Sequence, residues 1–293
     1  MKKTLRQSAT ITGVGLHTGL PVTLTLRPAP PHTGIIFQRT DLNHFEIEAT
    51  RQHVARVSYA TTLMRKGVLI STVEHLLSAL HALCVTDVYV ELNAMEVPIL
   101  DGSADPFVRM IDEAGLTEIG SSLEPLRIVK PIEIRQGSKF AAVYPGERLR
   151  ITYEIDFPHP MIGKQSLDIE ITFNSYRRGI APARTFGFYH EIQDLMQNGL
   201  VRGGSFDNAI VLDHQGVMNP DPWLRYPDEF VRHKILDLIG DLSLVGRPIL
   251  GHIVISRGGH ALHAALTSAI HREHQPAKIT PTAELRACSS PAW

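Results

Sequence analysis

Cysteine is scarce in this chain of 293 residues, which contains Cys84 and Cys288 alone. Two thiols cannot form an all-thiolate structural zinc site or a framework of disulfides, and so few are typical of a reducing compartment. Long apolar runs are missing too. None approaches the roughly 18 residues that a membrane span needs, and none follows the basic start at residues 1–6, as it would in a signal peptide. We therefore expect a cytoplasmic protein without an integral membrane segment.

An excess of charge of either sign is also missing. Lysine and arginine number 29 against 30 acidic residues, which gives a net charge of −1 and a pI near 7.0. A chain with this balance presents no global basic field for nucleic acid or an anionic membrane, and its few aromatic residues are not interleaved with basic ones. The expected partner is a small molecule rather than nucleic acid, and the expected oligomeric state is a monomer.

Strand-like alternation and helical periodicity occur in both halves of the chain. Strands are expected at residues 22–26, 68–70, 87–92, 140–144, 149–157, 167–171 and 249–256. Helices are expected at residues 71–83, 105–114, 188–197 and 228–244, and from the turn at 258–259 to about 271. Small and polar residues cluster at 120–125. This order predicts two α+β domains, at residues 1–123 and 124–275, followed by a disordered tail at 276–293.

Two helical fragments carry candidate metal ligands. His233 and Asp237 are four residues apart, so they lie on one face of a helix. His75 directly follows Glu74 in the other fragment. Two histidines and one aspartate make the open three-ligand set of a catalytic Zn²⁺, and Glu74 is then free to accept a proton from water. If the two fragments meet in space, the chain is a metal-dependent hydrolase.

Each of these side chains also has an ordinary structural interpretation. His75 could be a core histidine bonded to a carbonyl group. Residues 71–74 match a capping box, in which Glu74 would bond back to the amide at the start of its helix. His233 and Asp237 could form a solvated helix face, and Lys234 could be surface charge.

Two further residues extend the candidate site. Asp241 continues the row of His233 and Asp237 by one turn, where a carboxylate could orient a histidine. His260 follows the glycine pair at 258–259 and is a candidate acid for a leaving group. A capping or surface histidine is the alternative interpretation of His260.

Five separated motifs resemble the family of UDP-3-O-acyl-N-acetylglucosamine deacetylases, the zinc amidases of lipid A biosynthesis in Gram-negative bacteria. They are found at residues 71–76 (STVEHL), 183–188 (ARTFGF), 204–209 (GSFDNA), 230–241 (FVRHKILDLIGD) and 259–262 (GHAL). The resemblance extends from about residue 4 to about residue 271. Together and in this order the motifs are highly specific, although no single one of them is.

The resemblance implies a fold, an activity and a set of site residues. The fold would be two β-α-α-β domains of similar structure, with their helix layers packed together between two outer sheets. The activity would be hydrolysis of the N-acetyl group of UDP-3-O-(3-hydroxyacyl)-N-acetylglucosamine, giving the free amine and acetate. The implied roles are those of zinc ligands (His75, His233, Asp237), general base (Glu74), catalytic histidine (His260), its aspartate partner (Asp241), oxyanion donor (Thr185) and substrate-binding lysine (Lys234).

The resemblance also implies where the rest of the substrate lies. An insert in the second domain, near residues 188–202, would form an apolar tunnel for the acyl chain. The implied substrate contacts are Leu63, Lys139, Phe157, Phe186, Phe188, Leu195 and Leu200. Among these, Phe157 would stack on uracil and Lys139 would reach the diphosphate. The stretch at residues 61–68 is shorter than is usual in the family, which affects the pocket rim near Leu63.

Two other functions are compatible with parts of the pattern. A different zinc hydrolase acting on another acylated sugar would deacetylate without needing UDP. A binding protein with a structural metal would need a closed four-ligand site, and the sequence offers three ligands.

Overall fold

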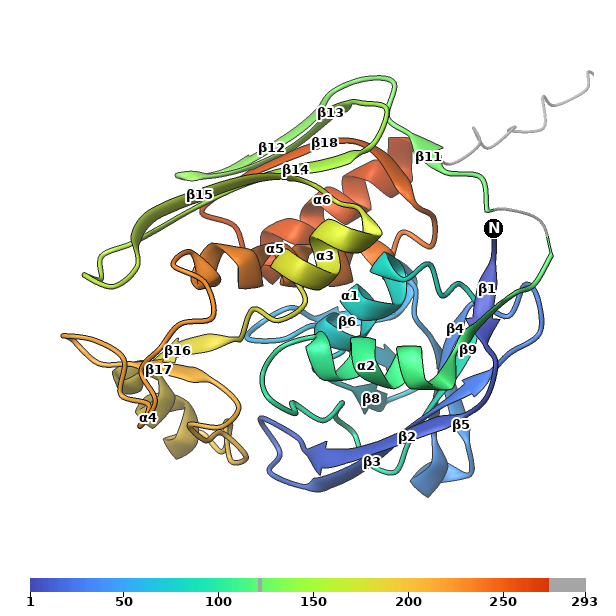
Figure 1. Ribbon diagram of the computed structural model, residues 1–293, viewed down its shortest axis with the longest axis horizontal. Coiled ribbons are helices and arrows are strands. Elements are labelled where there is room, and N and C mark those ends of the chain that lie inside the picture. The colour runs from blue at the N-terminus through green and yellow to red at the C-terminus, as the bar shows by residue number, and fades with distance from the viewer. Residues whose placement is uncertain (121–122, 274–293) are drawn as a thin grey trace, which may run out of the picture.

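A five-stranded sheet forms the outer layer of the N-terminal half in the computed structural model, which describes residues 1–120 and 123–273 (Figure 1). Its order is β2-β3-β9-β4-β5. The bounds are Ala9–Val14 (β2), Pro21–Pro28 (β3), Val88–Leu92 (β9), Ile35–Arg39 (β4) and Phe45–Glu48 (β5). Val22, Leu24 and Leu26 alternate along β3 and are all buried, as expected for a strand with one face on the core.

The outer sheet of the C-terminal half repeats this topology. Its order is β12-β13-β18-β14-β15, and β11 pairs with β18 beside it. The bounds are Leu126–Arg127 (β11), Ile132–Gln136 (β12), Lys139–Pro145 (β13), Leu149–Phe157 (β14), Gly163–Glu170 (β15) and Ile249–Ser256 (β18). In each sheet the last strand lies between the second and third and is parallel to the third. A parallel pair requires a crossover, and the crossovers carry helices.

The central helices lie between the two sheets, as Figure 1 shows. Helices α1 (Glu74–Ala82) and α2 (Asp105–Ala114) belong to the first half, and α5 (Glu229–Ser243) and α6 (His260–Glu273) to the second. Helix α1 packs against α5 across the middle of the molecule. A short helix, α3 (Phe173–Gly179), is tied to α1 by a hydrogen bond from the Tyr176 hydroxyl to Ser78 Oγ, 3.0 Å. The predicted α+β class, with helix layers between two outer sheets, is confirmed.

A smaller unit stands at one end of this sandwich. It contains the parallel pair β16 (Phe186–Phe188) and β17 (Ile210–Leu212) and the helix α4 (Tyr189–Gln197), at the lower left of Figure 1. No residue of α4 is fully buried. The unit includes residues 188–202, where the resemblance implies an insert, and continues to β17.

The remaining short elements close the edges of the first half. Their bounds are Lys3–Leu5 (β1), Thr40–Leu42 (η1), Arg51–His53 (η2), Val54–Arg56 (β6), Thr62–Arg65 (β7), Val68–Ile70 (β8) and Leu116–Glu118 (β10). Strand β1 pairs with β10, and β6, β7 and β8 form a small antiparallel sheet.

The predicted division into domains at residue 123 stays a prediction. The strands of the first large sheet all precede residue 120 and those of the second all follow residue 123. The tail predicted at residues 276–293 lies outside the described residues. Within the described residues, no helix has the length and apolarity needed to cross a membrane.

Candidate metal centre and active site

The crossing of α1 and α5 brings the two predicted ligand fragments together. The two backbones approach closely at one point, where a Cβ atom on Gly240 would lie only 2.1 Å from the carbonyl oxygen of Glu74. Glycine is therefore required there by the close approach. The contact places the first turn of α1, which carries His75, beside the face of α5 that carries His233 and Asp237.

The three candidate ligands converge on one point. Their ligand atoms all lie within 4.8 Å of one another. Asp237 Oδ1 is 3.3 Å from His233 Nε2 and 3.6 Å from His75 Nε2. Bonds of about 2.0–2.2 Å to a tetrahedral Zn²⁺ would separate neighbouring ligand atoms by about 3.4 Å, so the donor set fits this ion. All three side chains are buried, which excludes a solvated helix face.

His233 is held in the tautomer and protonation state that a metal ligand needs. Its Nδ1 lies 3.1 Å from the carbonyl oxygen of Ala183 and donates to it, so the lone pair is on Nε2, which faces Asp237. Burial lowers the pKa of His233 to about 3. The ring is therefore neutral at physiological pH and able to bind a cation.

Glu74 does not close a capping box, and that structural interpretation is wrong. Helix α1 begins at Glu74 without a side-chain cap, and the Ser71 hydroxyl forms a hydrogen bond with the Thr62 hydroxyl at 2.8 Å instead. Glu74 Oε2 accepts from the Thr61 amide at 3.1 Å, and its Oε1 lies 3.6 Å from His260 Nε2. Burial raises the pKa of Glu74. A buried carboxylate with a raised pKa beside a metal centre suits a general base.

His260 begins α6 and is oriented by Asp241. Its Nδ1 lies 2.8 Å from Asp241 Oδ2, and its Nε2 faces Glu74 and Asp237. Burial by itself would lower the pKa of His260, but the charge and hydrogen bond of Asp241 outweigh burial and raise this pKa to about 10. The ring is therefore cationic at neutral pH and can act as an acid.

Two residues of this site escaped the sequence analysis. The Thr61 hydroxyl donates to Asp241 Oδ1 at 2.5 Å, and His263 Nδ1 lies 2.8 Å from Asp241 Oδ2. His263 Nε2 in turn lies 2.9 Å from the Tyr153 hydroxyl. The spacing of His260 and His263 along α6 could have indicated His263, since positions i and i+3 share a helix face. Nothing local distinguishes Thr61.

Asp241, His260 and His263 also form a compact group of possible metal ligands. Both rings present Nδ1 to the same carboxylate oxygen at hydrogen-bonding distance. Hydrogen bonding therefore accounts for this group without a cation.

The predicted substrate residues fall into two sets. Phe157, Phe186 and Phe188 form one aromatic cluster, with ring centroids 5.7–5.8 Å from Phe157 to the other two, and Phe186 also contacts His233 at 6.4 Å. Lys234 Nζ donates to Asp237 Oδ2 at 2.8 Å and lies over the Phe186 ring. Phe186 and Lys234 therefore lie beside the candidate metal centre, and Phe157 and Phe188 extend the aromatic cluster away from it.

The other predicted substrate residues lie elsewhere, and the predicted oxyanion donor, Thr185, is held by a backbone contact. Leu63 has no exposed surface and belongs to the hydrophobic core, so we do not carry it into the proposed substrate contacts. Lys139 is exposed at the start of β13, and Leu195 and Leu200 are half-buried in and after α4. The Thr185 amide donates to the Gly102 carbonyl at 2.8 Å, which joins this segment to the first half.

Comparison with known proteins decides the family. The sequence pattern of the family described as LpxC, UDP-3-O-acyl N-acetylglycosamine deacetylase, matches residues 2–272. The chain belongs to this family. It is 48% identical to the UDP-3-O-acyl-N-acetylglucosamine deacetylase of Solibacter usitatus, over 91% of this chain and 90% of that protein. The identity to the deacetylase of Myxococcus xanthus is also 48%, over 96% of this chain and 89% of that protein. The resemblance inferred from five motifs, and with it the expectation of a hydrolase, is confirmed.

Proposed function

We propose that this protein hydrolyses the N-acetyl group of UDP-3-O-(3-hydroxyacyl)-N-acetylglucosamine, releasing acetate and the free amine in lipid A biosynthesis. We further propose that His75, His233 and Asp237 hold the Zn²⁺ that the reaction requires. The observation that carries the proposal is the convergence of these three ligand atoms within 4.8 Å, from helices of both halves. Membership of the deacetylase family supports it.

The chain's own side chains supply the proton transfers. Zn²⁺, when bound, polarises the amide carbonyl and lowers the pKa of water to about 7. Glu74 accepts a proton from the attacking water, and His260 donates one to the nitrogen as the C–N bond breaks. The Thr185 hydroxyl donates to the oxyanion that forms; one such donor contributes roughly 2.7–4 kcal/mol in other enzymes. Asp241 keeps the His260 ring oriented with Nε2 towards the reacting atoms.

The remainder of the substrate extends over the aromatic cluster and the small unit of α4. Phe157 stacks on the uracil, Lys139 reaches the diphosphate, and Lys234 contacts the sugar beside the metal centre. The acyl chain runs along Phe186 and Phe188 to Leu195 and Leu200. Each buried CH₂ group contributes about 0.8 kcal/mol, so the acyl chain supplies a large share of the binding.

Acetate release by the purified, zinc-loaded protein tests this proposal. We expect turnover of the acylated substrate and far lower efficiency on UDP-N-acetylglucosamine, which lacks the acyl chain. Glu74→Gln should retain zinc and lower kcat roughly 10²–10⁴-fold, whereas His75→Ala should lose zinc as well. His44→Asn, at an exposed histidine, is the matched control and should behave as wild type. Full activity of metal-free wild type would overturn the proposal.

A further inference from the structure

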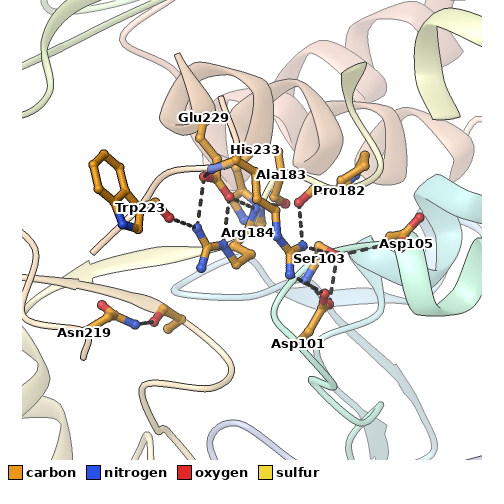
Figure 2. Close-up of polar contacts among 12 residues, drawn as sticks. Asp101, Ser103, Asp105, Pro182, Ala183, Arg184, Asn219, Trp223, Glu229 and His233 are labelled. Atoms are coloured by element: carbon orange, nitrogen blue, oxygen red, sulfur yellow. Dashed lines mark hydrogen bonds and ion pairs between the residues drawn. The ribbon is translucent and has the colours of Figure 1, made fainter. Parts of the chain in front are cut away.

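A buried carboxylate outside the candidate metal centre binds the chain segment at residues 182–185, which contacts His233 (Figure 2). Glu229, in the first turn of α5, has no exposed surface. Its carboxylate accepts from the Arg184 amide and Nε, both at 2.9 Å, from Arg184 Nη2 at 3.2 Å and from the Arg225 amide at 2.6 Å. Burying a charge is costly unless it is paired and hydrogen-bonded, and the Glu229 carboxylate is paired with Arg184 and also accepts from the Arg225 amide.

The residues on either side of Arg184 both serve the candidate site. The carbonyl of Ala183 accepts from His233 Nδ1, and the next residue after Arg184 is Thr185, the proposed oxyanion donor. Figure 2 shows Ala183, Arg184, Glu229 and His233 gathered at the start of α5. The Arg184 amide that donates to Glu229 and the Ala183 carbonyl that accepts from His233 belong to the same peptide group, so Glu229 fixes the orientation of that group.

The guanidinium group of Arg184 is bound mainly to the protein itself. Its Nε and Nη2 bind Glu229, and Nη2 also donates to the Trp223 carbonyl at 3.0 Å. The side chain is 16% exposed. An arginine in this motif would otherwise be an obvious candidate for binding a diphosphate, but here its Nε and Nη2 atoms bind protein groups.

A second arginine holds the same segment from the other side. Arg225 Nη1 donates to the Pro182 carbonyl at 2.8 Å, and Nη2 binds Asp101 of the first half at 2.9 Å. The segment that contacts His233 is therefore bound to both halves of the molecule.

We propose that Arg184 and Glu229 are positioning residues for the metal centre. They hold the Ala183 carbonyl so that the His233 ring presents Nε2 to the metal, and they hold Thr185 beside it. The inference rests on the proposed metal site. In other metalloproteins, removing a residue that orients a ligand lowers metal affinity roughly 10–100-fold.

Zinc affinity, measured on metal-free protein by competition with a chromophoric chelator, tests this role without any turnover. Glu229→Gln removes the charge, and Arg184→Lys keeps the charge but loses the two-pronged geometry. We expect both to bind zinc roughly 10–100-fold more weakly, with a lower kcat and an unchanged KM. The Co²⁺ absorption spectrum, which reports ligand geometry, should change in both.

Asp228→Asn is the matched control. Asp228 pairs with Arg232 at the same helix end, and Arg232 holds the Gly179 carbonyl rather than Ala183. This variant removes an ion pair at the same helix end and should keep wild-type zinc affinity and Co²⁺ spectrum.

The outcomes separate the two proposals. Wild type that binds no zinc would refute the proposed function itself. Folded variants with wild-type zinc affinity and Co²⁺ spectrum would overturn the positioning role alone, as would an Arg184→Lys variant whose KM rises at unchanged zinc affinity. If Glu229→Gln does not fold, Arg184→Lys decides.

Discussion

The carboxylate of Asp241 is the centre of the hydrogen bonding behind the candidate site. It accepts from Thr61 and binds the rings of His260 and His263, and it is buried. A buried carboxylate stays ionised only with such partners, and its charge keeps His260 protonated. Stability and the protonation of His260 are therefore linked.

The stability of the metal-free protein should fall as the pH rises. The folded-state pKa of His260, about 10, exceeds the value of about 6.5 for an unfolded chain. The contribution of His260 to the free energy of unfolding is thus complete below pH 6.5. It is lost as the pH rises towards 10, by at most about 1.4 kcal/mol per pH unit.

Urea unfolding of apoprotein between pH 6 and 10 measures this slope. The difference between wild type and His260→Gln should shrink steadily with pH, whereas His44→Asn should follow wild type throughout. Parallel curves for wild type and His260→Gln would rule out the linkage.

Between elements, the contact of α1 with α5 decides whether a metal site exists. The ligands on α5 share one helix face, but His75 joins them only because Gly240 lets the two backbones meet. Even one methyl group in this crossing would force the helices apart, since packed interiors have little room to adjust.

Gly240→Ala should therefore weaken both folding and zinc binding. Alanine gains up to about 1 kcal/mol in helix propensity over glycine, but its Cβ would meet backbone at 2.1 Å. Overpacking costs about 1–3 kcal/mol, and we expect a net loss in urea unfolding.

Gly216→Ala is the control, since a Cβ atom there would meet nothing within 4 Å. Its stability should stay within about 0.5 kcal/mol of wild type. A Gly240→Ala variant with wild-type stability and zinc affinity would show that the close approach is unimportant.

For the whole molecule, the repeated topology of the two halves places equivalent helices at the centre. Helices α1 and α5 occupy the crossover between the third and last strands of their sheets. A metal held by both would connect the halves and be lost on unfolding, because the unfolded chain has no preformed site.

Zinc should accordingly raise the Tm in a concentration-dependent way. At zinc concentrations 100-fold above Kd, the expected stabilisation is about 2.7 kcal/mol. Calorimetry of apoprotein titrated with zinc measures it, and His75→Ala should lose the effect. An identical response from His75→Ala would mean that zinc binds elsewhere.

Local sequence patterns were sufficient to predict many of the strands and helices. Alternation predicted β14 and an apolar run predicted β18, with their observed bounds of 149–157 and 249–256, and the turn before residue 105 with the glycine at 115 predicted α2 at 105–114. Helix α3 was missed, although Thr172 and Ser175 form a capping box at its start. The alternative capping box at residues 71–74 does not form because Ser71 bonds to Thr62 and Glu74 to the Thr61 amide, partners that no local pattern reveals.

The sequence by itself determined the kinds of ligand and the helical phase that puts His233 and Asp237 on one face, because both follow from neighbours along the chain. Only the tertiary structure decided that His75 completes the set, that Glu74 faces the centre, and that Thr61 reaches Asp241 across 180 residues. Such contacts depend on how the two helix layers cross, and the crossing is a property of packed surfaces rather than of spacing in the chain.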